Sequence, residues 1–197
     1  MVETTVDLGG LALTVLHPPD AEELLDEQAF ERDEFLPYWA ELWPSSLALA
    51  RFVAGLELAG ERVLELGCGL ALPSLVAARG GADVLATDWS PDALAFAERN
   101  AARNGVELRT RLLAWDRPLD TAGEGWSLVL ASDVLYERRN VEPLLELLPA
   151  LGAEVLLADP GRPALRAFIE GAEERWHVEV VGAPELPRGG IHRLRAR

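Results

Sequence analysis

Short apolar runs alternate with amphipathic stretches along most of the chain from Arg62 onward. The apolar runs cover residues 63–66, 84–87, 108–113, 128–131 and 155–158, and apolar positions at helical spacing mark residues 71–79, 91–104, 140–148 and 163–175. Continuous apolar runs of this length are typical of strands that are buried on both faces of a parallel sheet. The pattern therefore predicts a doubly wound α/β fold with helices on both faces of the sheet.

The pattern before this region is different. Residues 4–16 form two short apolar runs around Gly9 and Gly10, which predicts a β-hairpin that ends at Pro18 and Pro19. Asp20 is a suitable N-cap for a short helix through about residue 30. Helical spacing returns from residue 45 to about residue 58, after an aromatic loop.

The end of the chain predicts an antiparallel pair of strands. Residues 178–181 and 191–196 are joined through prolines and the Gly189-Gly190 pair. We find no internal repeat, low-complexity segment or linker in the sequence. We therefore expect one domain over residues 1–197, in which residues 1–60 are an extension covering the site and residues 61–197 form a Rossmann-like core.

Composition and charge narrow the range of partners. The formal net charge is −15, and every basic side chain other than histidine is an arginine, because the sequence has no lysine. Phosphate backbones would repel such a chain, so we expect no nucleic acid partner. No apolar stretch is long enough to span a membrane, and no signal-peptide pattern is evident. A single cysteine cannot form an internal disulfide, and no Cys/His cluster has metal-ligand spacing. We therefore expect a cytoplasmic monomer without a metal.

A glycine-containing loop follows the first predicted strand of the core. Its sequence is Glu65-Leu-Gly67-Cys-Gly69, and glycine permits backbone angles and close approaches that a Cβ would block. In an open α/β sheet this first crossover is where a nucleotide-like ligand lies. Asp88 ends the second strand, where its carboxylate can accept hydrogen bonds from both ribose hydroxyls of an adenosine.

Two classes of nucleotide-like ligand share this layout. A dinucleotide fold requires Gly-x-Gly-x-x-Gly, so that backbone amides can hold a pyrophosphate, and Leu72 occupies the third glycine position here. Glu65 is also unsuited to a pyrophosphate, whereas it suits a ligand with ammonium and sulfonium charges. A P-loop is excluded because it needs a lysine. The residues therefore favour S-adenosylmethionine as the cofactor.

The loop and the strand-end acid together resemble the class I, or seven-β-strand, S-adenosylmethionine-dependent methyltransferases. Four further segments, within residues 35–165, extend the resemblance to the protein lysine methyltransferases, including the electron-transfer-flavoprotein β-subunit lysine methyltransferase. They are the entrance segment over residues 37–46, which contains the Trp39-x-x-x-Trp43-Pro pattern, the pair Trp115-Asp116, the motif Ser132-Asp133-Val-Leu-Tyr136 and the turn Asp159-Pro-Gly-Arg162-Pro163. The resemblance implies a mostly parallel seven-stranded sheet with an antiparallel C-terminal strand.

The resemblance also implies roles for individual residues. It assigns Asp133 and Tyr136 to catalysis, and Asp116 to the adenine amine. It assigns cofactor binding to Trp43, Glu65, Gly67, Cys68, Gly69, Asp88, Trp89, Trp115, Asp116 and Ser132. Two positions depart from the family pattern, since Ala71 stands where many members have a third glycine and Ser132 where a glycine is expected.

Several of these residues have structural alternatives. Asp133 and Tyr136 are three residues apart after a strand, so they either hold an amine by charge and aromatic face or cap and support the next helix. Trp39 and Trp43 either stack in the core or line the site. Arg162 follows a Pro-Gly turn, where it lies on the surface, orders the substrate loop or pairs with Asp133.

The chemistry leaves three functions open. The first is methylation of a lysine amine of a protein, in which the side chains mainly bind, align and desolvate the reactants. The second is methylation of a small molecule, of the nicotinamide or amine type, which would usually need more cover over the site. The third is a non-catalytic adaptor that binds S-adenosylmethionine. A lysine acceptor within the chain itself is excluded, because the sequence has none.

Overall fold

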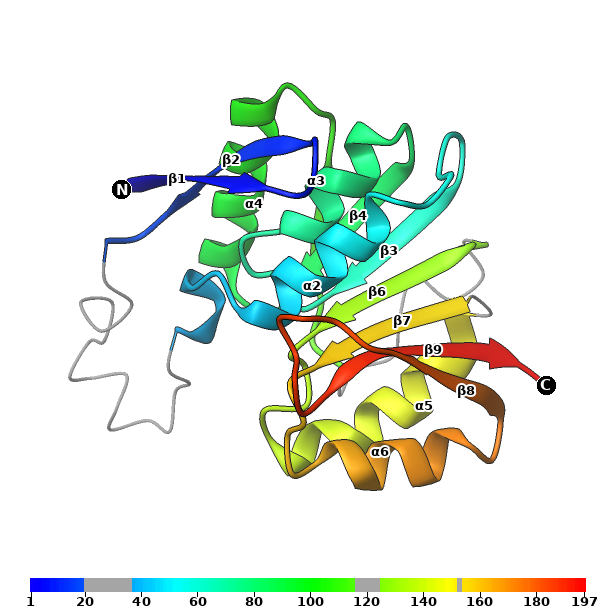
Figure 1. Cartoon of the computed structure of the whole chain (residues 1–197). Helices are drawn as coiled ribbons and strands as arrows, with labels where there is room; N and C mark the ends of the chain where they lie inside the picture. Colours follow the sequence, from blue (N-terminus) through cyan, green and yellow to red (C-terminus); the bar gives the residue numbers. More distant parts are fainter. Residues whose placement is uncertain (20–36, 116–124, 152–153) are drawn as a thin grey trace.

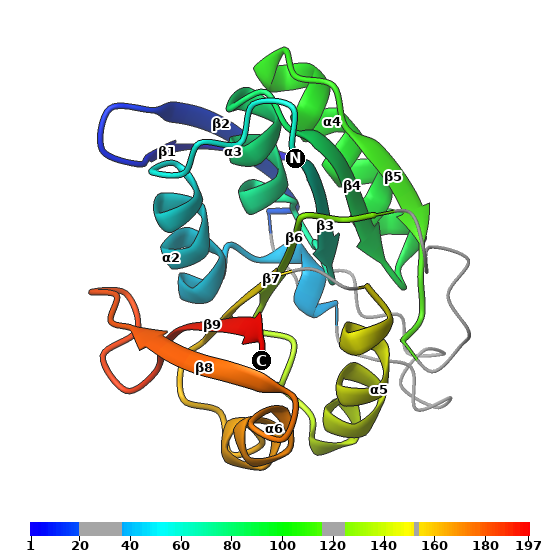
Figure 2. The same cartoon turned by 90° about the vertical axis from the view of Figure 1, so that its right-hand side faces the viewer.

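A computed structural model of the chain describes residues 1–19, 37–115, 125–151 and 154–197. Its centre is a seven-stranded sheet with the strand order β5-β4-β3-β6-β7-β9-β8 (Figures 1 and 2). Strands β3 to β7 pair in parallel, and β9 pairs antiparallel with both β7 and β8. The strands are β3 Arg62–Leu66, β4 Asp83–Asp88, β5 Arg109–Leu112, β6 Leu128–Ser132, β7 Glu154–Asp159, β8 Trp176–Val181 and β9 Gly190–Ala196. The predicted fold class is confirmed.

Helices cover both faces of the sheet (Figure 1). One face carries α2 (Pro44–Val53), α3 (Leu72–Arg79) and α4 (Pro91–Asn104), and the other carries α5 (Val141–Leu151) and α6 (Leu165–Ala172). Each face has its own buried apolar cluster, because successive strand side chains point to opposite faces. Burial on both faces explains why β3, β4, β6 and β7 are mostly apolar, whereas the edge strand β5 has no buried residue.

Helix ends agree with the sequence in part. Helix α4 has the predicted bounds, with Ser90 as its N-cap, Pro91 in its first turn and Gly105 as a left-handed C-cap at φ 64°. Helix α2 ends at Val53, five residues before the predicted Leu58. Gly55 lies in the turn that follows, where its N–H donates to the Phe52 carbonyl, and glycine disfavours continuation of a helix.

The predicted hairpin is present as a separate two-stranded sheet. Strand β1 (Val2–Asp7) pairs antiparallel with β2 (Ala12–His17). The turn between them uses Gly9 and Gly10, both at positive φ, and their N–H groups donate to the Asp7 carboxylate over 2.9 and 3.3 Å. The helix predicted over residues 20–30 lies outside the described residues.

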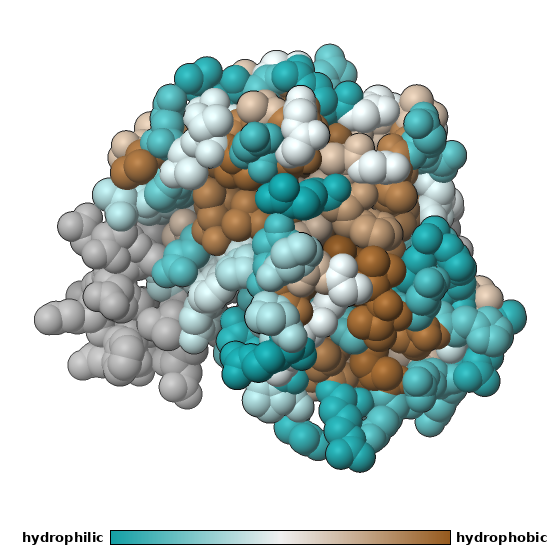
Figure 3. Space-filling model, in the orientation of Figure 1, coloured by the Kyte–Doolittle hydropathy of each residue, from teal (hydrophilic) through white to brown (hydrophobic). Residues whose placement is uncertain are grey.

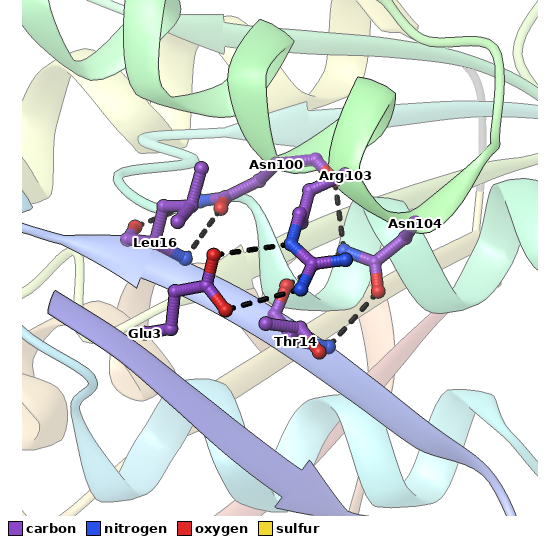
Figure 4. Close-up of polar contacts among 6 residues, drawn as sticks. All are labelled: Glu3, Thr14, Leu16, Asn100, Arg103 and Asn104. Atoms are coloured by element: carbon purple, nitrogen blue, oxygen red, sulfur yellow. Dashed lines mark hydrogen bonds and ion pairs between the residues drawn. The ribbon is translucent and has the colours of Figure 1, made fainter.

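Two asparagines on α4 hold the hairpin against the core (Figure 4). The Asn100 amide accepts from the Leu16 N–H over 2.7 Å and donates to the Leu16 carbonyl over 3.2 Å. Asn104 repeats this pattern one helical turn later with Thr14, over 2.9 and 2.8 Å. The two amides therefore bond the edge of β2 as a neighbouring strand would.

Asn100 also connects the hairpin to the glycine loop. Its Nδ2 atom donates a further hydrogen bond to the Leu70 carbonyl over 3.1 Å, and the side chain is fully buried. Asn104 instead donates to the backbone carbonyl of Asn100. One buried amide thus joins the hairpin, α4 and the predicted cofactor loop.

The surface is mixed in character. On the face shown in Figure 3, hydrophilic residues dominate the periphery and apolar residues gather toward the middle of the view. Among the residues that the structure describes, no helix combines the length and the apolar character needed to cross a bilayer.

Candidate active site

A pocket opens at the carboxyl ends of β3, β4 and β6, where the sequence predicted a ligand. It contains ten of the predicted site residues: Trp43, Gly67, Cys68, Gly69, Asp88, Trp89, Trp115, Ser132, Asp133 and Tyr136. Glu65 does not line it, and Asp116 lies outside the described residues. Within the described ranges, no group of three or more His, Cys, Asp or Glu residues is arranged to hold a metal ion.

The glycine loop has close protein neighbours on both sides. Gly67 and Gly69 adopt φ values of 62° and 52°, in the left-handed region that favours glycine. A Cβ on Gly67 would lie 3.1 Å from the Trp115 ring, and one on Gly69 would lie 3.1 Å from the Trp39 carbonyl oxygen. Both glycines therefore serve the packing of the pocket wall.

Ala71 adopts the same left-handed conformation without being glycine. Its φ is 63°, and it precedes the first residue of α3. The alanine that replaces the family's third glycine is therefore accommodated in a conformation that costs a non-glycine residue about 1–2 kcal/mol.

Asp88 ties the end of β4 to the loop. Its Oδ2 accepts from the Gly69 N–H and its Oδ1 from the Ser90 N–H, both over 2.9 Å. The side chain is buried, and burial raises its pKa while these backbone donors oppose the rise. The Trp89 N–H is a third backbone donor to this carboxylate, so only part of its acceptor capacity is left for a ligand.

Glu65 is turned away from the pocket, beneath α3. The Ser74 N–H donates to its Oε2 over 3.0 Å, and the Ser74 hydroxyl makes a second, shorter bond to the same atom. Its Oε1 has no hydrogen-bond partner, and the residue is fully buried. Burial raises the pKa of Glu65 to about 8, so this acid holds a proton at neutral pH.

Cys68 is a buried free thiol in the loop. Burial raises its pKa well above its usual range, since the thiolate would be desolvated next to Asp88 and Glu65. A thiol in such surroundings is inert, so Cys68 supplies a small side chain and not a nucleophile.

The entrance segment carries three aromatic side chains with different contacts. The Trp43 Nε1–H donates to the Tyr38 carbonyl over 2.6 Å. Trp39 packs on Phe96 of α4, with ring centroids 5.3 Å apart. Trp39 and Trp43 both line the pocket, so each takes the wall position that the sequence left open.

Tyr38 and Tyr136 meet across the pocket, with ring centroids 5.2 Å apart. Burial, followed by the charge of Glu137, raises the pKa of Tyr136 to about 12. Tyr136 is therefore a neutral phenol at physiological pH, suited to contact and orientation and unsuited to accepting a proton.

Asp133 pairs with Arg162, as one interpretation of the sequence predicted. The Arg162 Nε donates to Oδ1 over 2.8 Å and its Nη2 to Oδ2 over 3.1 Å, a bidentate arrangement. Asp133 has φ 56° and is 7% exposed, and its N–H donates to the Ala158 carbonyl of β7. The guanidinium carbon of Arg162 lies 5.8 Å from the centroid of the Trp43 ring.

Some lining residues were missed at the level of the sequence. They are Tyr38, Glu41, Ser46, Leu70 and Val134, together with Arg162 as a wall of the pocket. Leu70 follows the glycine loop, and the others lie inside the segments that carry the resemblance, so the signal was their place in a motif and not their chemistry. Tyr38 is 38% and Trp89 42% exposed, which makes them large aromatic side chains at an open rim.

Comparisons with known proteins agree with this geometry. The sequence profile of the lysine methyltransferase family matches residues 34–158. The chain is 34% identical over 133 residues to the electron transfer flavoprotein beta subunit lysine methyltransferase of Danio rerio, covering 64% of this chain and 51% of that protein. It is 32% identical to protein N-lysine methyltransferase METTL21A of Danio rerio, covering 72% of this chain and 70% of that protein.

A solved structure extends the likeness of the fold. The TehB-like SAM-dependent methyltransferase of Corynebacterium glutamicum superimposes with a TM-score of 0.62 at 16% identity, covering 90% of this chain and 98% of that one. The chain spans about half the length of the first of the curated relatives that it matches.

Proposed function

This chain belongs to the lysine methyltransferase family, and on that premise we propose that it uses S-adenosylmethionine to methylate a lysine side chain of another protein. The observation that carries the proposal is a single pocket that joins the glycine loop and Asp88 to Asp133 and Tyr136. A cofactor end and an acceptor end in one cavity are what methyl transfer requires.

The pocket fits a positively charged cofactor. Among its described lining residues the charged ones are Glu41, Asp88, Asp133 and Arg162, so acids outnumber bases. A net negative wall favours ammonium and sulfonium groups. The acceptor capacity that remains on the Asp88 carboxylate suits a ribose hydroxyl.

We assign the predicted cofactor residues to this end of the pocket in two groups. Those that line it are proposed to contact the cofactor: Trp43, Gly67, Cys68, Gly69, Asp88, Trp89, Trp115 and Ser132. Glu65 is proposed to act from behind the loop, by fixing the start of α3 through Ser74. The adenine role of Asp116 stays a prediction.

The acceptor end is proposed to lie between Tyr38, Trp43 and Tyr136. S-adenosylmethionine, when bound, supplies the activated methyl group, so the side chains must align the amine and exclude water. A lysine amine has a pKa near 10.4 in water and must be neutral to react. An aromatic wall helps by withdrawing the ammonium from solvent.

The acceptor is proposed to be a protein with exposed basic residues. The relatives named above are lysine methyltransferases, and a net charge of −15 favours approach of a basic partner. Residues 37–46 reach the pocket from the proposed covering extension, and Tyr38 among them is 38% exposed. The cytoplasm is the compartment that we propose, on the grounds of composition.

The proposal is tested by incubating this protein with a cell lysate and S-adenosylmethionine that is labelled in its methyl group. We expect label in a protein band, and methylated lysine after its hydrolysis. Label in a small molecule would instead support the small-amine enzyme, and binding without label would support the adaptor.

A variant of the acceptor end separates chemistry from binding. We expect Asp133→Asn to lower the labelling rate by about 10- to 100-fold, while calorimetry with S-adenosylhomocysteine shows an affinity within about twofold of the unaltered protein. An equal loss of labelling rate and of affinity would contradict the placement of Asp133 at the acceptor end.

A further inference from the structure

The carboxylate of Asp133 is already paired with Arg162. Both of its oxygens accept from the guanidinium, over 2.8 and 3.1 Å, and the acid is 7% exposed. An incoming ammonium group therefore meets an ion pair and not a single negative charge. This differs from the sequence-based expectation that Asp133 holds a cationic amine.

Arg162 is held in this position from its own backbone. The N–H groups of Gly161 and Arg162 both donate to Oδ1 of the fully buried Asp159, each over 2.7 Å. Gly161 has φ 93°, and a Cβ there would lie 2.6 Å from the Arg188 carbonyl oxygen. The turn after β7 is therefore closely packed, which fixes the backbone position from which the Arg162 side chain extends.

The groups that face the pair come from several elements. They are Asp159 at the end of β7, Tyr38 in the 3-10 helix Tyr38–Ala40, Tyr136 after β6, Asp88 at the end of β4, and Glu41 at the rim. Asp88 is engaged by backbone donors at the cofactor end. At the acceptor end, one carboxylate and one guanidinium are directly paired, with Asp159 behind them and Glu41 at the rim.

We propose that Arg162 is a positioning residue that neutralises Asp133, so that the acceptor end of the pocket selects an uncharged amine. A lone buried carboxylate would stabilise an ammonium ion and raise the pKa of the acceptor. Once it is paired with a guanidinium that never deprotonates, that stabilisation is removed, and the amine releases its proton to water before it enters. The inference rests on the proposed function and refines its acceptor.

The same arrangement restricts the class of acceptor. A primary amine becomes neutral at accessible pH, whereas an arginine side chain keeps its charge because its pKa exceeds about 12. A site with a cancelled carboxylate therefore accepts lysine or another alkyl amine and excludes guanidinium groups. The 18 basic residues of this chain, all arginines, are then not acceptors in its own pocket.

The test is the pH dependence of the labelling rate, with heat-inactivated lysate as the acceptor at low concentration. Arg162→Gln frees the Asp133 carboxylate. We therefore expect the acidic limb of the variant's pH–rate profile to move up by about one pH unit, and the variant's labelling rate at neutral pH to fall about tenfold. At high pH the rate should return to within about threefold of the unaltered protein. Calorimetry with S-adenosylhomocysteine should show an unchanged affinity.

Two further variants separate charge from structure. Arg162→Lys keeps the positive charge, so we expect the acidic limb of its pH–rate profile to stay in place. Label is counted only in the lysate bands and not in the variant itself. Arg166→Gln makes the same charge change on α6, where the side chain is 88% exposed and paired with Glu170, and should leave the profile unaltered. If Arg162→Gln does not fold, the pH–rate profile of Arg162→Lys decides. An acidic limb at the position of the unaltered protein supports the proposal, and a shifted limb contradicts it.

Other outcomes overturn the inference. Coincident profiles for Arg162→Gln and the unaltered protein would make the ion pair merely structural. A faster rate at neutral pH without a shift would show that the acceptor displaces Arg162 as a competing cation. Absence of labelled lysine with the unaltered protein at every pH would instead refute the proposed function.

Discussion

The two ends of the pocket are built in different ways. The cofactor end is made from consecutive backbone around Gly67 and Gly69 and from Asp88 at the next strand end. The acceptor end is made from side chains that are far apart in sequence, including Tyr38, Asp133 and Arg162. One end is therefore set by the course of the main chain, and the other by contacts between loops.

This difference explains how one fold serves several acceptors. Buried polar bonds from Asn100 to Leu70 and from Ser74 to Glu65 fix the cofactor loop from behind. The acceptor end is held by one ion pair and by aromatic contacts at an open rim. Loops can change without disturbing the sheet, so the acceptor end can change without altering the cofactor end.

The strongest way to break the cofactor end alone is Asp88→Ala. A hydrogen bond that a ribose hydroxyl donates to a charged carboxylate is worth up to about 3 kcal/mol, so we expect the affinity for S-adenosylhomocysteine to fall about 100-fold in calorimetry. Asp92→Ala removes an exposed acid from the first turn of α4 and is the matched control. A loss of less than about threefold in Asp88→Ala would show that Asp88 only ties the loop to β4.

A smaller effect is expected from the amides behind the loop. Asn100→Ala leaves the Leu70 carbonyl without its donor, so we expect about a tenfold loss of affinity for S-adenosylhomocysteine as the loop relaxes. Asn104→Ala removes the equivalent bonds to Thr14 without touching the loop, and its affinity should stay within about twofold.

Both asparagine variants should also lower the free energy of unfolding, because each releases the edge of β2. Denaturant unfolding measures that common loss, and calorimetry measures the difference between them. Equal affinities in the two variants would mean that the hairpin supports the fold without supporting the cofactor loop.

Glu65 predicts a pH dependence of stability that belongs to the cofactor end. Its folded pKa of about 8 lies above the usual 4.5, so between these values the folded state binds more protons than the unfolded state. Stability then falls as pH rises through this window, by about 1 kcal/mol between pH 6.5 and 7.5, and levels off above the folded pKa. Denaturation of Glu65→Gln should show a flatter profile, whereas Glu61→Gln, at an exposed position, should keep the original slope.

Much of the fold and of the cofactor end was predictable from the sequence. The apolar runs predicted the parallel strands, and the loop around Gly67 with the acid Asp88 predicted the position of the pocket. Both signals are local, since a strand, its turn and the next strand end follow each other along the chain. Glu65 was the exception, because strand alternation directs it under α3 and toward Ser74.

The acceptor end was less predictable because it depends on which strands are neighbours. The residues of the Asp133–Arg162 pair are 29 positions apart, and they meet because β6 lies beside β7. The roles of Asn100 and Asn104 depend on where the hairpin docks, which no local pattern indicates. The four-residue spacing of the two asparagines places them on one helix face, but it does not indicate which segment they bind.

The smallest effect is expected at Ala71, where the backbone already has the conformation of a glycine. Ala71→Gly relieves about 1–2 kcal/mol of left-handed strain, but it loses a buried methyl group worth about 0.8 kcal/mol and adds about 0.4–1 kcal/mol of unfolded-state entropy. These terms nearly cancel, so denaturant unfolding should change by less than about 1 kcal/mol. Gly69→Ala has no such compensation, because its Cβ would lie 3.1 Å from the Trp39 carbonyl oxygen at φ 52°, and it should lose both stability and cofactor affinity. A loss in Gly69→Ala no larger than the about 1–2 kcal/mol of left-handed strain at Ala71 would mean that strain alone, and not the approach of the entrance segment, explains the glycine at position 69.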